Sequence, residues 1–167
     1  MGAYRSRMDP EARKLIRSLD LAPHPEGGFY RETYRAKIEV HVHGGTRAAQ
    51  TQIYFLLPAG AFSALHRVAS DEAWHHYDGD PVDLHLIDEA GRHSIVTLGH
   101  RYDEGERPQH VVPAGIWQAA VPRGSRFALC GCTVAPGFDF VDFSMPARAE
   151  LLALFPQHAE LVTRLTR

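Results

Sequence analysis

The sequence has no apolar run long enough to cross a membrane. Its longest, Ile53–Leu57, stops at Pro58, whereas a membrane-spanning helix needs about 20 apolar residues. A basic cluster is missing as well, because 18 Lys and Arg stand against 20 Asp and Glu, for a formal net charge of −2. The electrostatic footprint of a nucleic-acid-binding protein is therefore absent. We expect neither a membrane nor a nucleic acid as partner.

Cysteine is scarce, and the chain carries two, Cys130 and Cys132. They are two residues apart in a predicted strand, so their side chains point the same way and are poorly placed to form a disulfide. A second pair that would complete a tetrahedral metal site is missing. Two reduced thiols in core positions favour a cytoplasmic protein.

The overall composition is that of a globular protein. The 167 residues are 44% hydrophobic and 23% charged, which excludes disordered, collagen-like and coiled-coil classes. A chain of this length can bury a full core without disulfides or structural metals. We expect a single domain over residues 1–167.

Short strands dominate the predicted secondary structure. Asp9 and Pro10 predict the start of one short helix, with Asp9 as N-cap, and a helical pattern returns from Pro146. Between them, segments rich in aromatic and β-branched residues are separated by Gly, Pro or Asp. We expect these segments to be strands at 29–35, 50–57, 61–67, 72–77, 82–88, 93–98, 109–112, 116–121, 126–134 and 138–143. The pattern predicts an all-β sandwich or jelly-roll β-barrel with short N- and C-terminal helices.

The segment from Gly60 to Gly79 carries the most informative chemistry. His66 and Val68 share a strand face, and a turn then brings Glu72 beside them on the neighbouring strand. The expected pair of His66 and Glu72 suits metal ligation or acid–base catalysis, because the carboxylate orients the ring and raises its basicity. A buried ion pair kept for structure is the alternative.

The spacing of this segment resembles the first motif of the cupin superfamily, G-x5-H-x-H-x3-E-x6-G. Gly60, His66, Glu72 and Gly79 match it, with Val68 where the second histidine would stand. A weaker second motif, P-x-G-x2-H, resembles residues 113–118 and places Gln118 at the last metal-binding histidine. Val68 cannot bind a metal, and an amide oxygen is a poor ligand for the ions that imidazole attracts. The resemblance thus implies the cupin fold more strongly than a metal.

A closer resemblance covers nearly the whole chain. The sequence segments on which this resemblance rests are 23–32 (PHPEGGFYRE), 53–57 (IYFLL), 65–67 (LHR), 70–75 (SDEAWH), 79–81 (GDP), 112–118 (VPAGIWQ) and 134–140 (VAPGFDF). They are similar to the cupin 5 family, the domain of unknown function 985. This resemblance implies a cupin jelly-roll barrel, or double-stranded β-helix, similar to bacterial dTDP-sugar epimerases and commonly paired as a homodimer, with no settled reaction.

Several further residues are candidates for ligand binding. At the second motif, the Trp117 indole could stack on a ligand while the Gln118 amide forms hydrogen bonds with the polar edge of that ligand. Core packing is the alternative for Trp117. Tyr30 follows the Glu26–Gly28 stretch and is a third candidate. Strand alternation from Glu72 turns His76 inward, whereas the family strings align His75, and a bulge would reconcile the two.

Other polar residues have ordinary interpretations. Arg31 could clamp an anion, but a surface ion pair with Glu32 or a nearby Asp is favoured. His41 and His43 are expected to face solvent. His24, between two prolines, is expected to be a turn residue rather than a ligand.

Three functional hypotheses remain. The first is a cupin that binds a small molecule, such as a sugar or nucleotide-sugar, and acts on it as an isomerase or epimerase, with His66 taking a proton and Glu72 orienting it. The second is a non-catalytic ligand-binding or sensor cupin. The third is a metal-dependent cupin with a reduced ligand set of His66, Glu72 and His75 or His76, holding a divalent metal.

Overall fold

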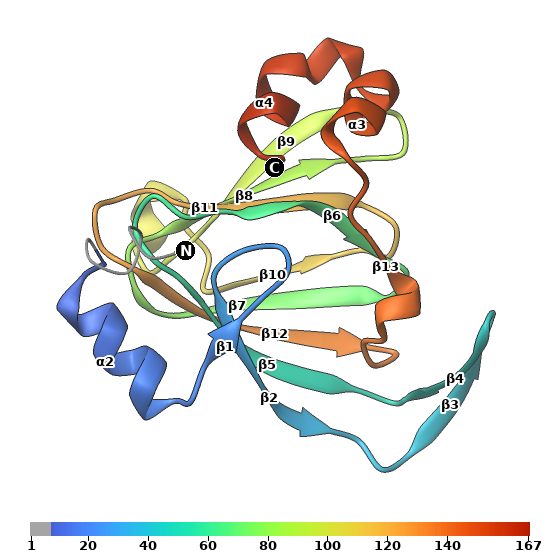
Figure 1. Ribbon diagram of the computed structural model, residues 1–167, viewed down its shortest axis with the longest axis horizontal. Coiled ribbons are helices and arrows are strands. Elements are labelled where there is room, and N and C mark those ends of the chain that lie inside the picture. Colours follow the sequence, from blue (N-terminus) through green and yellow to red (C-terminus); the bar gives the residue numbers. More distant parts are fainter. Residues whose placement is uncertain (1–7) are drawn as a thin grey trace.

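The chain folds into two facing antiparallel sheets, as the computed structural model of residues 8–167 shows (Figure 1). In spatial order, the larger sheet contains β1 (Ala22–Pro23), β2 (Phe29–Arg35), β5 (Thr51–Leu57), β12 (Ala128–Ala135), β7 (Asp71–Gly79) and β10 (Gln109–Val112). The smaller sheet contains β13 (Phe143–Ser144), β6 (Ser63–Val68), β11 (Trp117–Pro122), β8 (Val82–Ile87) and β9 (His93–Leu98). This is the predicted all-β jelly-roll barrel with short helices near both ends.

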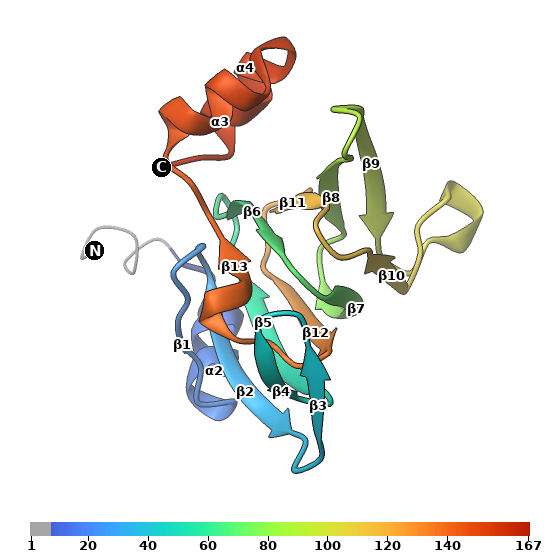
Figure 2. The ribbon, with the colours of Figure 1, turned by 90° about the vertical axis from the view of Figure 1, so that its right-hand side faces the viewer.

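Helices cover the outer faces of both sheets. They are α2 (Pro10–Ser18), α3 (Arg148–Leu154) and α4 (Ala159–Arg164), with 3-10 turns η1 (Tyr102–Glu104), η2 (Phe140–Asp142) and η3 (Pro156–His158). Helix α2 packs on the larger sheet near Leu56 and Leu129, and α3 and α4 pack on the smaller sheet (Figure 2). Among residues 8–167, none of these helices combines the length and the apolar character that a membrane crossing requires.

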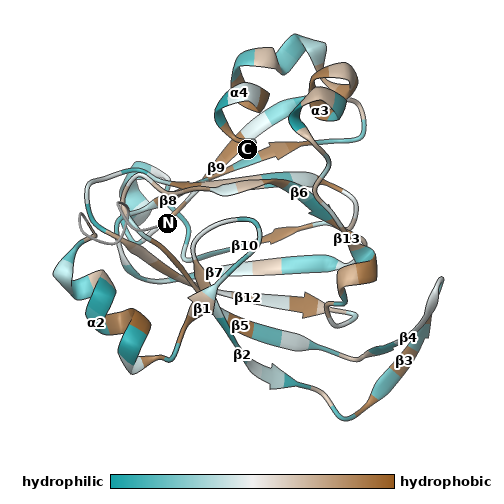
Figure 3. Cartoon of the chain, viewed as in Figure 1, coloured by the Kyte–Doolittle hydropathy of each residue, from teal (hydrophilic) through white to brown (hydrophobic). Residues whose placement is uncertain are grey.

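The first helix begins where the sequence predicts. The Asp9 carboxylate accepts a hydrogen bond from the Glu11 backbone N–H at 2.8 Å, and Pro10 occupies the first helical position, where its missing N–H costs nothing. Hydrophilic and hydrophobic segments alternate along α2 (Figure 3). Ala12 is buried, and Leu15, Ile16 and Leu19 pack around the same cluster.

Two segments differ from the prediction. Residues 39–48, where no strand was predicted, form a hairpin of β3 (Glu39–Val42) and β4 (Gly45–Ala48), with positive φ at Gly44 and Gly45 in its turn. His41 and His43 are exposed on it, as expected. Residues 138–143, predicted as one strand, contain the η2 turn, because the Asp139 carboxylate accepts the Val141 N–H and curls the backbone before β13.

One part of the barrel interior is filled with hydrocarbon. Phe55, Trp74, Leu84 and Leu98 pack there with both cysteines, which are buried and free of disulfides, as their spacing predicts. The polar residues of the candidate site line another part of the space between the sheets. The fold thus separates a packed core from a chamber that can admit a small molecule.

Candidate functional site

A cavity of about 300 Å³ opens between the two sheets. Its floor is formed by three buried side chains, His66, Glu26 and Glu72, which are 2%, 6% and 7% exposed. Arg35 and Phe140 line the same cavity and are exposed, so they mark its mouth. Ligand sites are typically concave, largely apolar and furnished with a few convergent polar groups, and this cavity has that character.

The tautomer of His66 is fixed by its backbone partner. Its Nδ1 lies 2.8 Å from the Ala64 carbonyl oxygen, and because a carbonyl only accepts, Nδ1 carries a hydrogen. The ring stacks on Phe143 at 5.3 Å between centroids. Nε2 is therefore left facing the floor, free to accept a proton.

The partner of His66 Nε2 is Glu26, at 3.2 Å from Oε2. Burial raises the pKa of Glu26 to about 8, and burial lowers the pKa of His66. Near pH 7 the carboxyl therefore holds the proton and donates it toward the neutral imidazole. The sequence predicted Glu72 beside His66, and the two side chains do line the same cavity and interact electrostatically. The carboxyl that makes the short contact with His66 is, however, that of Glu26.

A tight glycine turn places Glu26 on the floor. Gly27 and Gly28 have φ of +118° and +71°, and a Cβ at Gly27 would collide with the Phe62 carbonyl oxygen. The Ala64 N–H and the Arg167 side chain both donate to the Glu26 backbone carbonyl, at 2.8 and 3.1 Å. The turn is thereby tied to strand β6, which carries His66.

Glu72 is held by a chain of hydrogen bonds rather than by His66. The Trp74 indole N–H donates to Gln118 Oε1 at 2.9 Å, and Gln118 Nε2 donates to Glu72 Oε2 at 2.6 Å. Burial raises the pKa of Glu72, and the electrostatic interaction with nearby His66 lowers this pKa by a smaller amount. Gln118 was predicted to read a ligand; its amide instead orients Glu72, which lines the cavity.

Two residues of the site, His24 and Glu26, are not predicted as site residues by the sequence patterns. His24, assigned to a turn, also lines the cavity, where burial lowers its pKa to about 4. Glu26 precedes Gly27 and Gly28 in the sequence, and no motif marks it as a partner of His66. The family string at residues 23–32 contains both, but their contact with His66 depends on tertiary packing between the turn and β6. Tyr30 does line the cavity and packs edge-on against His24 at 4.5 Å.

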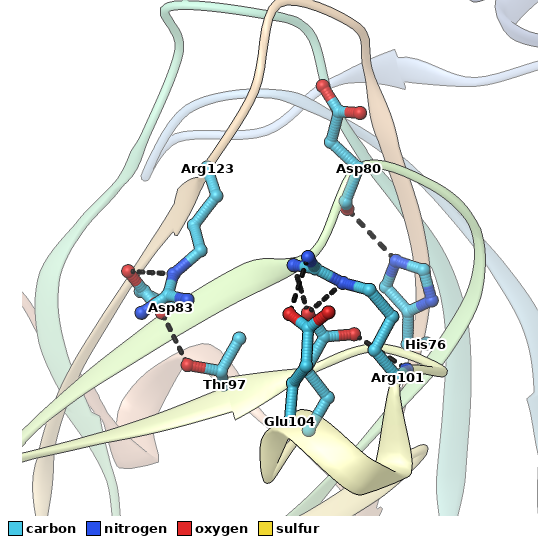
Figure 4. A network of polar contacts seen from close by, with 8 residues as sticks. His76, Asp80, Asp83, Thr97, Arg101, Glu104 and Arg123 are labelled. Atoms are coloured by element: carbon cyan, nitrogen blue, oxygen red, sulfur yellow. Dashed lines mark hydrogen bonds and ion pairs between the residues drawn. The ribbon is translucent and has the colours of Figure 1, made fainter.

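The neighbouring histidines lie away from the cavity. His76 faces inward, as strand alternation from Glu72 predicts, but it lies farther along β7, beyond the cavity. Its Nε2 donates to the Asp80 carbonyl at 2.9 Å (Figure 4). His75 occupies the opposite face, 3.4 Å from the Thr133 hydroxyl. The β7–β12 register shifts between Leu129 and Cys130, opposite Tyr77 and so after both histidines. Neither ring joins His66 and Glu72.

Trp117 also lies outside the cavity. It belongs to the cluster beneath the C-terminal helices, where its ring meets Phe155 edge-on at 6.0 Å and the Arg67 guanidinium at 4.8 Å. Adjacent strand residues point to opposite faces, so Gln118 faces the interior and Trp117 cannot. Trp117 is packed in the hydrophobic core, which was the alternative to ligand binding. Arg31 is exposed and donates to the Leu19 carbonyl at 3.2 Å.

The residues of this site do not fit a metal ion. Val68 lines the cavity without a donor atom, and Gln118 Oε1 is occupied by the Trp74 indole. Over residues 8–167, no three or more His, Cys, Asp and Glu side chains are grouped so that they could hold a metal. What the geometry offers is a proton-sharing pair, Glu26 and His66, beside a second carboxyl at Glu72.

Comparison with known sequences identifies a matching family. The family model described as "Cupin superfamily (DUF985)" matches residues 13–146. Among curated proteins, the chain is 32% identical over 149 residues to a Saccharomyces cerevisiae protein described as "Uncharacterized protein YML079W", covering 77% of this chain and 72% of that one.

Solved structures give the same likeness. Protein SO0799 from Shewanella oneidensis has a TM-score of 0.87 and 38% identity over 93% of this chain and 97% of its own. A hypothetical protein from Leishmania major has a TM-score of 0.86 and 37% identity over 93% and 98%. Oxalate decarboxylase from Bacillus subtilis has a TM-score of 0.55 and 19% identity over 88% of this chain and 38% of its own, a likeness of fold alone.

Proposed function

Because this chain belongs to the DUF985 family of the cupin superfamily, we propose that it binds a small polar molecule in its barrel and moves a proton on it. The observation that carries the proposal is the buried contact of Glu26 and His66, 3.2 Å apart, at the floor of a cavity of about 300 Å³. Titratable groups with displaced pKa values in a cavity mark functional sites more often than structural ones.

The floor supplies what acid–base catalysis requires. A general base works best when its pKa lies near the working pH, and the pKa of Glu26, raised to about 8 by burial, meets that condition. A substrate C–H or O–H presented to this pair transfers its proton to the carboxylate form of Glu26, and the protonated carboxyl then donates a hydrogen bond to the lone pair of His66 Nε2. Glu72, oriented by Gln118, accepts a hydrogen bond from a substrate hydroxyl.

The specific activity in this scheme is that of an isomerase or epimerase. Such a reaction removes a proton from a carbon and returns it, with no net change in oxidation state and no metal. Sugars are one substrate class of suitable size. The protein works as a soluble cytoplasmic homodimer in this proposal, and sedimentation would then give twice the 18.6 kDa mass of the chain.

A non-catalytic binding or sensor cupin is the second candidate. Its support is Val68, an inert side chain in the cavity at the position of a ligand in the cupin motif. In this case the Glu26–His66 pair determines which ligand binds and performs no turnover.

Hydrogen exchange from solvent separates the two candidates. Metabolites that raise the melting temperature of the protein would be incubated with it in D₂O and followed by proton NMR, because ligand binding stabilises in either case. The acid–base proposal predicts loss of one C–H signal with the wild-type protein, with no such loss for His66→Asn or Glu26→Gln.

Each result of this experiment has one meaning. Binding without exchange supports the second candidate and contradicts catalysis. Exchange that persists in His66→Asn, which keeps a polar side chain on the floor, contradicts the role of the pair. Ile53→Trp, which fills the cavity from strand β5, serves as the blocked control and should neither bind nor exchange.

A further inference from the structure

We infer that the molecule this cavity takes is a small organic cation, a compact body that carries one protonated amine. The inference rests on the proposed binding function and names its ligand class. The observations behind it are the charges that line the cavity, the partners that already occupy its arginine, and the aromatic walls.

The lining is acidic. Four carboxyl side chains face the cavity: Glu26 and Glu72 on the floor, Glu32 and Asp139 nearer the mouth. Arg35 is the one lysine or arginine among the described residues that line it. A cavity lined by one sign of charge favours a ligand of the opposite sign.

Arg35 is not free to receive an anion. Its Nε and Nη2 donate to both oxygens of Glu32 at 3.0 and 2.7 Å, and its Nη1 donates to the Phe138 carbonyl at 3.2 Å. A bidentate pair of this kind satisfies the face of the guanidinium that would clamp a carboxylate or phosphate. The phosphates expected of a nucleotide-sugar therefore find no unoccupied arginine donor among the described residues of the lining.

The floor holds two buried carboxyls, Glu26 and Glu72, whose ionised forms lack a neighbouring cation among the described floor side chains. Glu26 meets His66 from β6, His24 from its own turn, Glu72 from β7, the Ser63 hydroxyl and Arg167 from the C-terminal end. Arg167 donates to the Glu26 backbone carbonyl. Burial keeps both histidines neutral near pH 7 by lowering their pKa values, that of His24 to about 4.

The two floor carboxyls repel one another when both are ionised. The charge of Glu26 raises the pKa of Glu72, in addition to the effect of burial. An ammonium group seated between them removes this repulsion and stabilises both ionised forms. The same group leaves the neutral histidines undisturbed.

Aromatic walls suit the same ligand. Tyr30, Phe138 and Phe143 line the cavity, with Ile53 and Val134 between the polar groups. Aromatic faces attract a nearby cation, and the aliphatic side chains accommodate an apolar ring. The volume of about 300 Å³ is sufficient for a six-membered ring with one substituent.

Three matched probes test the charge preference: cyclohexylamine, cyclohexanol and cyclohexanecarboxylate, titrated into the wild-type protein by calorimetry at pH 7. The ring is the same in each, so differences report the substituent. We expect the amine to bind at least tenfold more tightly than the alcohol, and the carboxylate to bind more weakly than either.

Proton release gives a second readout that needs no variant. Glu26, with its pKa raised to about 8, is mostly protonated at pH 7, and a bound ammonium forces it to ionise. Titration of cyclohexylamine in buffers of different ionisation enthalpy should show approximately one proton released per amine bound. The amine affinity should rise by close to tenfold from pH 6 to pH 7.

Variants assign the effect to the floor. Glu72→Gln should lower the affinity for cyclohexylamine about tenfold and leave that for cyclohexanol unchanged. Glu104→Gln, which removes an exposed carboxylate of η1 that pairs with Arg101, is the matched control and should change neither.

The outcomes separate this inference from the proposed function. Tighter binding of the alcohol or carboxylate overturns the ligand class and leaves the binding function standing. Amine binding without proton release also overturns it, because the floor is then not the site. Failure of all three probes overturns the inference too, whereas the proposed function is decided by its own exchange experiment with other metabolites.

Discussion

At the scale of the residue, Gln118 connects two buried polar groups. It accepts from the Trp74 indole and donates to Glu72, and all three side chains are buried. A buried donor or acceptor that loses its partner costs about 1–3 kcal/mol. The position of Gln118 therefore contributes to stability as well as to the orientation of Glu72.

Replacement of Gln118 by Met keeps the length of the side chain and removes both hydrogen bonds. We predict a loss of about 2–4 kcal/mol in the free energy of unfolding, because the Trp74 N–H is left unpaired and the Glu72 carboxyl loses the stronger of its two side-chain partners, keeping the Cys132 thiol. Urea denaturation measures it. Gln109→Met, at an exposed position of β10, is the control, and an equal effect of the two substitutions would contradict this account.

At the scale of the element, the Pro25–Gly28 turn determines where Glu26 lies. Gly27→Ala would place a Cβ against the Phe62 carbonyl at a φ of +118°. We predict a loss of about 2 kcal/mol or more, together with a displaced Glu26 and weaker ligand binding. Chemical denaturation and the calorimetric titrations measure the two effects.

The control for this turn is Gly44→Ala in the β3–β4 hairpin. Gly44 also has a positive φ, +101°, but a Cβ there meets nothing within 4 Å. It therefore reports backbone strain alone. Unchanged ligand binding in Gly27→Ala would show that the turn does not position Glu26.

A second element-scale contact joins the β3–β4 hairpin to the cavity mouth. Arg47 Nε and Nη2 donate to the two oxygens of Asp142 at 2.6 and 2.9 Å, beside the η2 turn that carries Phe140. We predict that Arg47→Met increases amide hydrogen exchange about tenfold within residues 39–48 and 138–143. Arg92→Met, which removes an exposed ion pair with Asp88, is the control and should leave exchange in both segments unchanged. If Arg47→Met also left exchange unchanged, the contact of Arg47 with Asp142 would not hold these segments in place.

At the scale of the whole molecule, the sequence predicts the architecture better than the site. Strands 29–35, 93–98 and 109–112 were predicted with their observed bounds, because alternation and turn residues are local properties. The β3–β4 hairpin was missed because most of its residues are polar or glycine and most are exposed. The Glu26–His66 contact joins residues 40 positions apart, and spacing within one motif could not identify it.

The buried acid also makes the stability of the whole molecule depend on pH. The pKa of Glu26 rises from 4.5 to about 8 on folding, so the folded state binds more protons and stability falls as pH rises toward 8. We predict a loss of about 1 kcal/mol between pH 7 and 8.5 in the wild-type protein. Glu26→Gln should reduce this loss, as measured by thermal unfolding, whereas Glu104→Gln should retain it; equal pH dependence in all three proteins would contradict the buried acid.

The most direct measurement is a ¹³C NMR titration of the Glu26 carboxyl, with the ring nitrogens of His66 followed in the same samples. The account predicts a Glu26 midpoint near pH 8 and, at pH 7, a neutral His66 with its hydrogen on Nδ1. A Glu26 midpoint near 4.5, or a His66 ring that carries its hydrogen on Nε2, would contradict it.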